Sequence, residues 1–159
     1  MLSAVIEKTS ALLARLTAVI VVLLAIGLVG SLLISIFFRY VIGQALSWPE
    51  EISLILFTWL VLLAGSLGVR EGFHVRLTIL SSRLPPKPRS YLDKAITASI
   101  GVFGCVLVYS GADLLARTST YLTATLRLPL EWINFSAPVC GGLIVLHSLA
   151  VLLAPGKEN

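Results

Sequence analysis

The sequence predicts an all-α integral membrane protein of four transmembrane helices, with the N-terminus and the C-terminus both in the cytoplasm. Hydrophobic residues make up 57% of the chain and charged residues only 13%, whereas soluble domains carry about 25% charged residues. Four windows contain no charged residue and are long enough to cross a bilayer. The Lys and Arg residues are concentrated on one side of these windows. Together these observations predict the fold class and the orientation.

The charged residues that flank each window set the bounds of the spans. We predict spans at about residues 16–38, 48–69, 95–115 and 132–154, with a basic cytoplasmic loop at 70–94. Each has the roughly 17–25 residues that a spanning helix needs. Residues 1–159 therefore form a single four-helix membrane domain in this prediction.

The first window is predicted to remain in the mature protein, although Lys8 and Arg15 precede it as basic residues precede a signal peptide. It is longer than the apolar region of a signal peptide, and no A-x-A cleavage site follows it. Upstream, apolar residues recur at helical spacing: Leu2, Val5, Ile6, Leu12, Leu13 and Leu16. We therefore expect an amphipathic N-terminal segment that lies along the membrane interface and leads into the first span.

The second span begins with a segment typical of a helix N-terminus. Ser47 and Glu50 have the S-x-x-E spacing of a capping box, and Pro49 falls in the first turn, where a missing N–H is tolerated. Glu50 and Glu51 lie near the positive end of the helix dipole, and Trp48 favours the headgroup layer. One interpretation is a well-capped helix end. The other is a docking motif of a membrane complex, because paired acids beside lipid are costly unless something neutralises them.

Arg39 and Tyr40 end the first span close to the acids that open the second. A bridge from Arg39 to one of these glutamates would neutralise an acid at the lipid boundary. Alternatively, Glu50 or Glu51 is left to contact a partner protein.

The distribution of basic residues predicts the orientation of the chain. Nine of the 12 Lys and Arg residues lie in the N-terminal segment, in the loop at 70–94 or at the C-terminus, so the positive-inside rule places these parts in the cytoplasm. Within the loop, Arg70, His74 and Arg76 are candidates either for general anchoring to lipid headgroups or for binding a specific phospholipid. The positive net charge then needs no nucleic acid to explain it.

The interiors of the predicted spans carry almost no polar chemistry. His147 is the only ionisable side chain well inside a span, and Cys105 and Cys140 each stand alone. A protein that moves polar solutes by itself usually places ionisable residues or broken helices near the midplane. We therefore predict no catalytic, substrate-binding or metal site, no cofactor and no enzyme activity in this chain.

Small residues at four-residue spacing indicate close packing between helices in lipid. Such stripes contain Gly27, Ser31 and Ser35 in the first span, Thr97, Gly101 and Cys105 in the third, and Ala137 and Gly141 in the fourth. Pro138 lies beside the last stripe, near the outer end of its span, where a kink is tolerable.

In their order and spacing, these features resemble the small membrane subunit of tripartite ATP-independent periplasmic (TRAP) transporters. The matching positions cover most of the chain: Arg39-Tyr40, Ser47-Trp48-Pro49-Glu50-Glu51, Phe57, Trp59, Gly65, Arg70, Gly72, His74-Val75-Arg76, Arg83-Leu84-Pro85, Leu126-Arg127-Leu128-Pro129 and Pro138. The resemblance makes interface candidates of Arg39, Tyr40, Ser47, Trp48, Glu50, Glu51 and Trp59.

The resemblance implies a non-catalytic scaffold in the bacterial inner membrane. Such a subunit packs against a separate large polytopic membrane subunit, which carries the substrate and sodium sites. A periplasmic binding protein delivers the organic acid for sodium-coupled symport. Nothing in the sequence selects one organic acid.

Three other functions are weighed against this one. A haem-bearing anchor of another membrane complex would use a level pair of histidines, yet His74 lies beyond its span and His147 lies roughly 10 Å inside its own. A small multidrug exporter would need an acid within the membrane, and the first span has none. A structural or assembly subunit of a different complex remains the third alternative.

Overall fold

The computed structural model describes residues 2–70 and 86–153. Its helices are α1 (Leu2–Phe37), the short π-helix η1 (Phe38–Ile42), α2 (Trp48–Arg70), α4 (Pro86–Thr118), α5 (Glu131–Asn134) and α6 (Ser136–Leu153). Four helical segments are long and apolar enough to cross a membrane: Ile6–Ile42, Trp48–Arg70, Tyr91–Thr118 and Glu131–Leu153. The predicted all-α class with four spans is confirmed.

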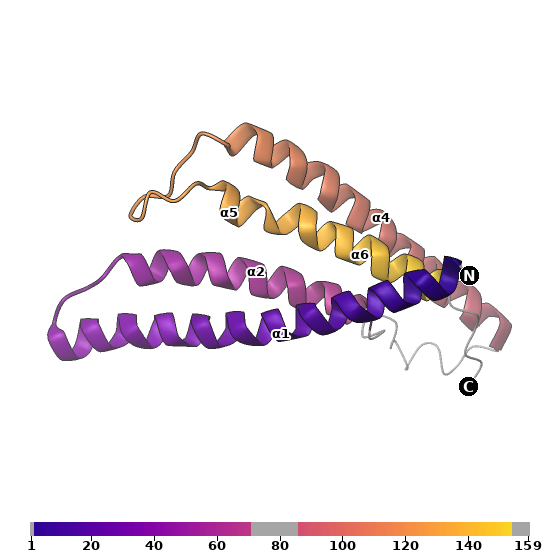
Figure 1. Cartoon of the computed structure of the whole chain (residues 1–159), viewed down its shortest axis with the longest axis horizontal. Helices are drawn as coiled ribbons and strands as arrows, with labels where there is room; N and C mark the ends of the chain where they lie inside the picture. The colour runs from indigo at the N-terminus through magenta and orange to yellow at the C-terminus, as the bar shows by residue number, and fades with distance from the viewer. Residues whose placement is uncertain (1, 71–85, 154–159) are drawn as a thin grey trace.

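The four long helices form an open fan (Figure 1). α1 packs along α2, α4 packs along α6, and contacts of α6 with α2 and α1 join the two pairs. The pairs lie close together where α1 begins and α6 ends, and they diverge toward the opposite end (Figure 1). We call the end where α1 begins and α6 ends the terminal end, and the opposite end the loop end. The start of α1 and the end of α6 therefore share one end of the molecule, as an even number of spans requires.

Burial in this fan is the reverse of burial in a soluble protein. The buried polar residues are Ser10, Thr17, Ser31, Ser35, Ser53, Ser66, Thr97, Thr123, Ser136, His147 and Ser148, whereas the buried hydrophobic residues are Leu63, Val69, Cys140 and Ile144. Many large apolar side chains along the spans point outward instead. Lipid tails are as apolar as leucine, so burying large side chains between helices brings little gain and small residues dominate the contacts.

Glycines bring α4 and α6 into backbone contact. A Cβ built on Gly141 would lie 2.7 Å from the carbonyl oxygen of Gly104, and one built on Gly111 would lie 2.6 Å from Cδ of Pro138. Gly101, from the predicted stripe, has only a looser contact of 3.4 Å with Cβ of Ser148. Cys105, the third member of that stripe, is exposed in this chain. The contact on α4 follows Gly104 and Gly111 instead.

The N-terminal segment and the first span form one continuous helix. α1 has 36 residues, which at a rise of about 1.5 Å per residue gives roughly 54 Å, well beyond the ~30 Å hydrocarbon core of a bilayer. The leucines of the predicted apolar stripe are not the packing face, since Leu12 and Leu16 are exposed while Ser10 is buried. The polar and small residues of this segment therefore contact the rest of the protein.

Candidate functional sites at the two ends of the fan

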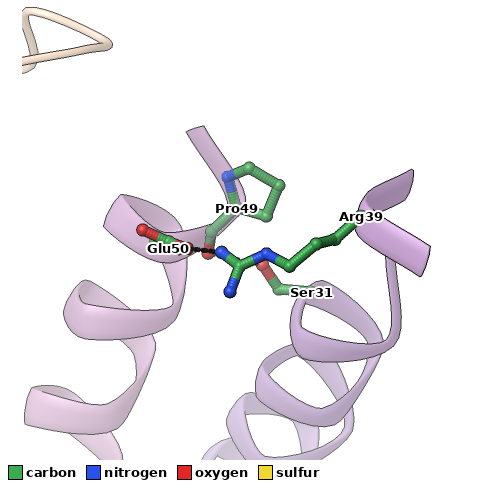
Figure 2. Close-up of polar contacts among 4 residues, drawn as sticks. All are labelled: Ser31, Arg39, Pro49 and Glu50. Atoms are coloured by element: carbon green, nitrogen blue, oxygen red, sulfur yellow. Dashed lines mark hydrogen bonds and ion pairs between the residues drawn. The ribbon is translucent and has the colours of Figure 1, made fainter. Parts of the chain in front are cut away.

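A reversal of the chain at the loop end brings the first two spans together. η1 ends at Gly43, whose φ of 75° suits glycine because it has no Cβ, and whose backbone N–H donates to the carbonyl oxygen of Phe38. Nη2 of Arg39 then lies 2.5 Å from Oε1 of Glu50 (Figure 2). The side chains of both residues are about half exposed. The bridge therefore lies on the surface and neutralises one of the two acids at this end.

A buried hydrogen bond fixes the start of α2 against α1. The hydroxyl of Ser31 donates to the carbonyl oxygen of Pro49 at 2.9 Å, and both residues are buried (Figure 2). Gly27, one turn earlier, brings α1 to 3.4 Å from a methyl group of Leu56, measured from a Cβ built on the glycine. The small residues predicted on α1 therefore do face α2. One of them contributes a hydrogen bond as well as space.

The predicted capping box is wrong in its bonds, although the helix begins at the predicted place. α2 starts at Trp48, directly after Ser47, and Pro49 lies in its first turn. Among the hydrogen bonds of the described residues, none involves the hydroxyl of Ser47, and the carboxylate of Glu50 binds Arg39 instead of returning to the cap. Competition from the guanidinium of Arg39 explains the difference, because a charged partner binds a carboxylate more strongly than a backbone amide does.

Glu51 fastens a hairpin-like loop to α2. Its Oε2 accepts the backbone N–H of Thr125 at 3.1 Å and that of Leu126 at 2.8 Å. The loop itself is closed by the backbone N–H of Thr123 donating to the carbonyl oxygen of Leu128, and by the N–H of Leu128 donating to the Thr123 hydroxyl. Both acids of the second span are thus engaged within the chain. Local spacing in the sequence does not predict this role of Glu51.

Trp59 joins α2 to the segment that precedes α6. Its indole Nε1 donates to the carbonyl oxygen of Trp132 at 2.7 Å, and its ring lies 6.5 Å from that of Phe135, between centroids. Nδ2 of Asn134 donates to the hydroxyl of Thr118, which ties α5 to the end of α4. The side chain of Trp59 therefore makes its contacts within this chain. Of the other interface candidates, Tyr40 is 79% exposed and Trp48 is half-buried.

The terminal end holds a buried polar chain across three helices. Nη1 of Arg70 donates to the hydroxyl oxygen of Ser10 at 3.0 Å, and this oxygen lies 2.8 Å from Nδ1 of His147. Ser10 and His147 are almost completely buried. Because Ser10 already accepts a hydrogen bond from Arg70, its own proton can go to Nδ1, which makes His147 the neutral tautomer protonated at Nε2. That Nε2 has no hydrogen-bond partner among the described residues.

The predicted cytoplasmic anchor is only partly described. Arg70 is half-buried at the end of α2, while His74 and Arg76 lie outside the described residues. His147, which the sequence analysis treated as an isolated ionisable residue, instead links α6 to α1. The only signal for this in the sequence is that a histidine inside an apolar span needs a polar partner.

A groove and a smaller pocket lie along the described part of the fan. An apolar groove of about 580 Å³ separates α2 from α4, with α6 as its floor, and its lining includes Leu62, Gly65, Phe103, Cys140 and Ile144. A pocket of about 280 Å³ lies between α1 and α2 at the terminal end. Among the side chains of residues 6–70 and 91–153, no cluster of three or more His, Cys, Asp or Glu could hold a metal ion.

The family model for the DctQ component of tripartite ATP-independent periplasmic transporters matches residues 28–155. The chain belongs to this family. The matched region begins in the middle of α1 and includes η1, α2, the groove and the loop held by Glu51. The DctQ component is a non-catalytic permease subunit, and with its four apolar helices the chain is a multi-pass protein of the inner membrane.

Curated relatives agree with the family. The chain is 30% identical to the sialic acid TRAP transporter small permease protein of Vibrio cholerae, over 70% of this chain and 64% of that protein. It is 30% identical to a TRAP small permease protein, described as putative, of Haemophilus influenzae, over 70% and 69%. The C4-dicarboxylate small permease protein of Rhodobacter capsulatus is 28% identical, over 69% and 49%. The alignment thus spans less than two thirds of the Vibrio and Rhodobacter relatives.

Another relative is a longer protein. The sialic acid TRAP transporter permease protein of Haemophilus influenzae is 26% identical over 77% of this chain, and the aligned part makes up only 20% of that permease. Membership of the DctQ family decides against a haem-bearing anchor and a multidrug exporter.

Proposed function

We propose that this chain is the scaffold-forming small subunit of a TRAP transporter, and that it packs against a separate large membrane subunit. The large subunit carries the organic acid and couples its uptake to sodium, and a periplasmic binding protein delivers the acid. The observation that supports this most strongly is the family match over residues 28–155. The described spans supply packing surfaces and anchored ends, and His147, which lies deep in a span, is already bonded to Ser10.

The apolar groove between α2 and α4 is our candidate for the contact with the large subunit. Its walls belong to two helices that α6 holds apart, and a helix of the partner can place a row of side chains between them. The long Haemophilus permease supports a contact with a large subunit, because the part related to this chain is one fifth of that protein. In that protein, the part related to this chain and the rest of the permease belong to one polypeptide.

A pair of glycine substitutions tests the groove. Gly65 lines it and Gly142 does not, yet a Cβ on either residue would meet nothing within 4 Å in this chain. Gly65→Phe should therefore leave the fold intact while filling the groove, and Gly142→Phe is the matched control. The measurement is co-purification, in mild detergent, of a large membrane subunit from the native membranes with the affinity-tagged chain.

We expect Gly65→Phe to reduce the recovered large subunit about ten-fold, as the loss of a central packing contact does in other interfaces, and Gly142→Phe to leave it unchanged. Uptake by cells that carry Gly65→Phe in place of the native gene should fall in parallel. Equal recovery with both variants would remove the groove as the contact surface. Recovery of the wild-type chain alone, with uptake intact in the deletion strain, would contradict the proposed function itself.

The proposed orientation places the terminal end in the cytoplasm and the loop held by Glu51 in the periplasm. The concentration of basic residues around the terminal end supports this proposal. An alkaline phosphatase fusion, which is active only in the periplasm, tests it at two positions. Insertion after Ala124 should give an active enzyme and fusion at the C-terminus an inactive one, whereas the reverse pattern would invert the topology.

A further inference from the structure

The smaller pocket combines two guanidinium groups with space between helices. It lies between α1 and α2 at the terminal end and is lined by Ala11, Ala14, Arg15, Ala18, Leu67 and Arg70. The alanines lie on one face of α1, three and four residues apart, so no large side chain fills the space between the two arginines. Its volume of about 280 Å³ is several times the ~30 Å³ share of a water molecule, which leaves room for a tetrahedral anion.

Arg70 is held in place by the buried polar chain. One of its N–H groups donates to Ser10, and Ser10 is in turn fixed by His147 on α6. A guanidinium has five N–H donors in a rigid planar fork, so most of them stay available to a ligand. The contact with Ser10 therefore orients the guanidinium of Arg70 before any ligand arrives.

The positive charge of this pocket is not neutralised within the described part of the chain. The ion pairs there join Arg39 to Glu50 and Arg117 to Asp113, and neither Arg15 nor Arg70 pairs with a carboxylate among residues 6–70 and 91–153. Two guanidinium groups that line one pocket repel each other unless an anion lies between them. Phosphate suits the arginine fork, because two parallel N–H groups can bind two of its oxygens.

The depth of the pocket in the molecule favours a phosphate at the membrane surface. Arg15 immediately precedes the charge-free part of α1, and Arg70 ends α2. These are the positions at which spans leave the hydrocarbon region and side chains reach the headgroup layer. A guanidinium at this depth attracts acidic lipids.

We propose that Arg15 and Arg70 form a binding site for a phosphate group. The guanidinium of Arg70 is preoriented, and the exposed guanidinium of Arg15 binds the phosphate from the other side. The same chemistry is offered by the headgroup of an acidic phospholipid and by inorganic phosphate in the cytoplasm. Ser10 and His147 act as positioning residues for Arg70. The site lies on this chain alone and does not depend on the proposed transport role.

Native mass spectrometry of the full-length chain in mild detergent tests the site, with phosphatidylglycerol as the probe. We expect the wild-type chain to retain one phosphatidylglycerol molecule. Arg15→Gln should weaken retention about ten-fold, because one charge-assisted contact to phosphate is lost. Arg15 makes no hydrogen bond or ion pair with the described residues, so this variant should fold normally. Arg70→Lys keeps the charge but loses the fork, and it should also weaken retention.

Arg117→Gln is the matched control, because it removes one exposed arginine charge from the loop end and should leave retention unchanged. Equal retention by the wild-type chain and Arg15→Gln would overturn the proposal, and so would an equal loss in Arg117→Gln. Competition distinguishes the two sources of phosphate. If excess inorganic phosphate displaces the lipid and stabilises the wild-type chain against heat, but not Arg15→Gln, the ligand is the free anion; if it does neither, the ligand is the lipid.

Discussion

The two helix pairs of this protein are held together by different means. α4 and α6 meet through glycines, so that the backbone of one helix touches the backbone of the other. α1 and α2 are held instead by side-chain bonds near their ends: Ser31 to Pro49 and Arg39 to Glu50 at the loop end, and Arg70 to Ser10 at the terminal end. The first pair depends on the absence of side chains and the second on the presence of particular ones. The pairs should therefore respond to substitution in opposite ways.

The largest effect is expected from the smallest added group. Gly141→Ala places a methyl group 2.7 Å from the carbonyl oxygen of Gly104, a backbone atom that cannot rotate away. We expect a loss of about 1 to 3 kcal/mol, the usual cost of overpacking, seen as a lower midpoint of thermal unfolding in detergent. Gly27→Ala in the other pair is the control, because its methyl group would meet only a flexible leucine at 3.4 Å. Equal losses in both variants would remove the proposed contrast.

A smaller and more local effect is expected where the two pairs are connected at the loop end. Glu51→Ala removes the acceptor of the backbone N–H groups of Thr125 and Leu126. We expect faster amide hydrogen exchange confined to residues 119–130, with a smaller change in the unfolding midpoint than Gly141→Ala causes. Glu50→Ala, which affects only the surface bridge, should leave exchange in this loop unchanged. Faster exchange throughout α4 and α6 in Glu51→Ala would mean that the loop supports the whole α4–α6 pair.

The smallest effect is expected at the surface bridge of the α1–α2 pair. Exposed ion pairs contribute below about 1 kcal/mol, and the side chains of Arg39 and Glu50 are 49% and 58% exposed. Arg39→Glu alone should lower the unfolding midpoint slightly, because it places two acids together. The double variant Arg39→Glu with Glu50→Arg should restore it. Failure of the double variant to recover would show that one of these residues has another essential contact.

The order of the helices could be predicted from the sequence, and their contacts only in part. Charge-free windows gave the four spans, but Lys8 and Arg15 interrupt hydropathy without interrupting a helix, so α1 extends further back than the predicted span. Small residues at every fourth position include Gly101 and Gly141 but not Gly104 and Gly111. On α4 the contact residues Gly101, Gly104 and Gly111 are three and seven residues apart, because they follow the line along which two crossing helices meet.

The polar contacts were harder to foresee because most of their partners are distant in sequence. Ser10 and His147 are 137 residues apart, and Glu51 is 74 residues from Thr125. Local spacing predicted a capping box at Ser47 and Glu50, whereas Arg39 from the preceding helix takes the carboxylate. Local sequence spacing thus correctly predicted where α2 begins, whereas the tertiary fold determines the hydrogen-bond partner of each side chain.

The open fan determines how far a short chain reaches across a membrane. Neighbouring packed helices lie roughly 8 to 10 Å apart, so four helices side by side cover roughly 30 Å between their outer axes, about three times the single spacing along one side of a square bundle. Each broad face of such a layer can meet a different environment, protein on one side and lipid on the other. Few residues then suffice to widen the footprint of a membrane complex, and a wider footprint resists tilting in the bilayer.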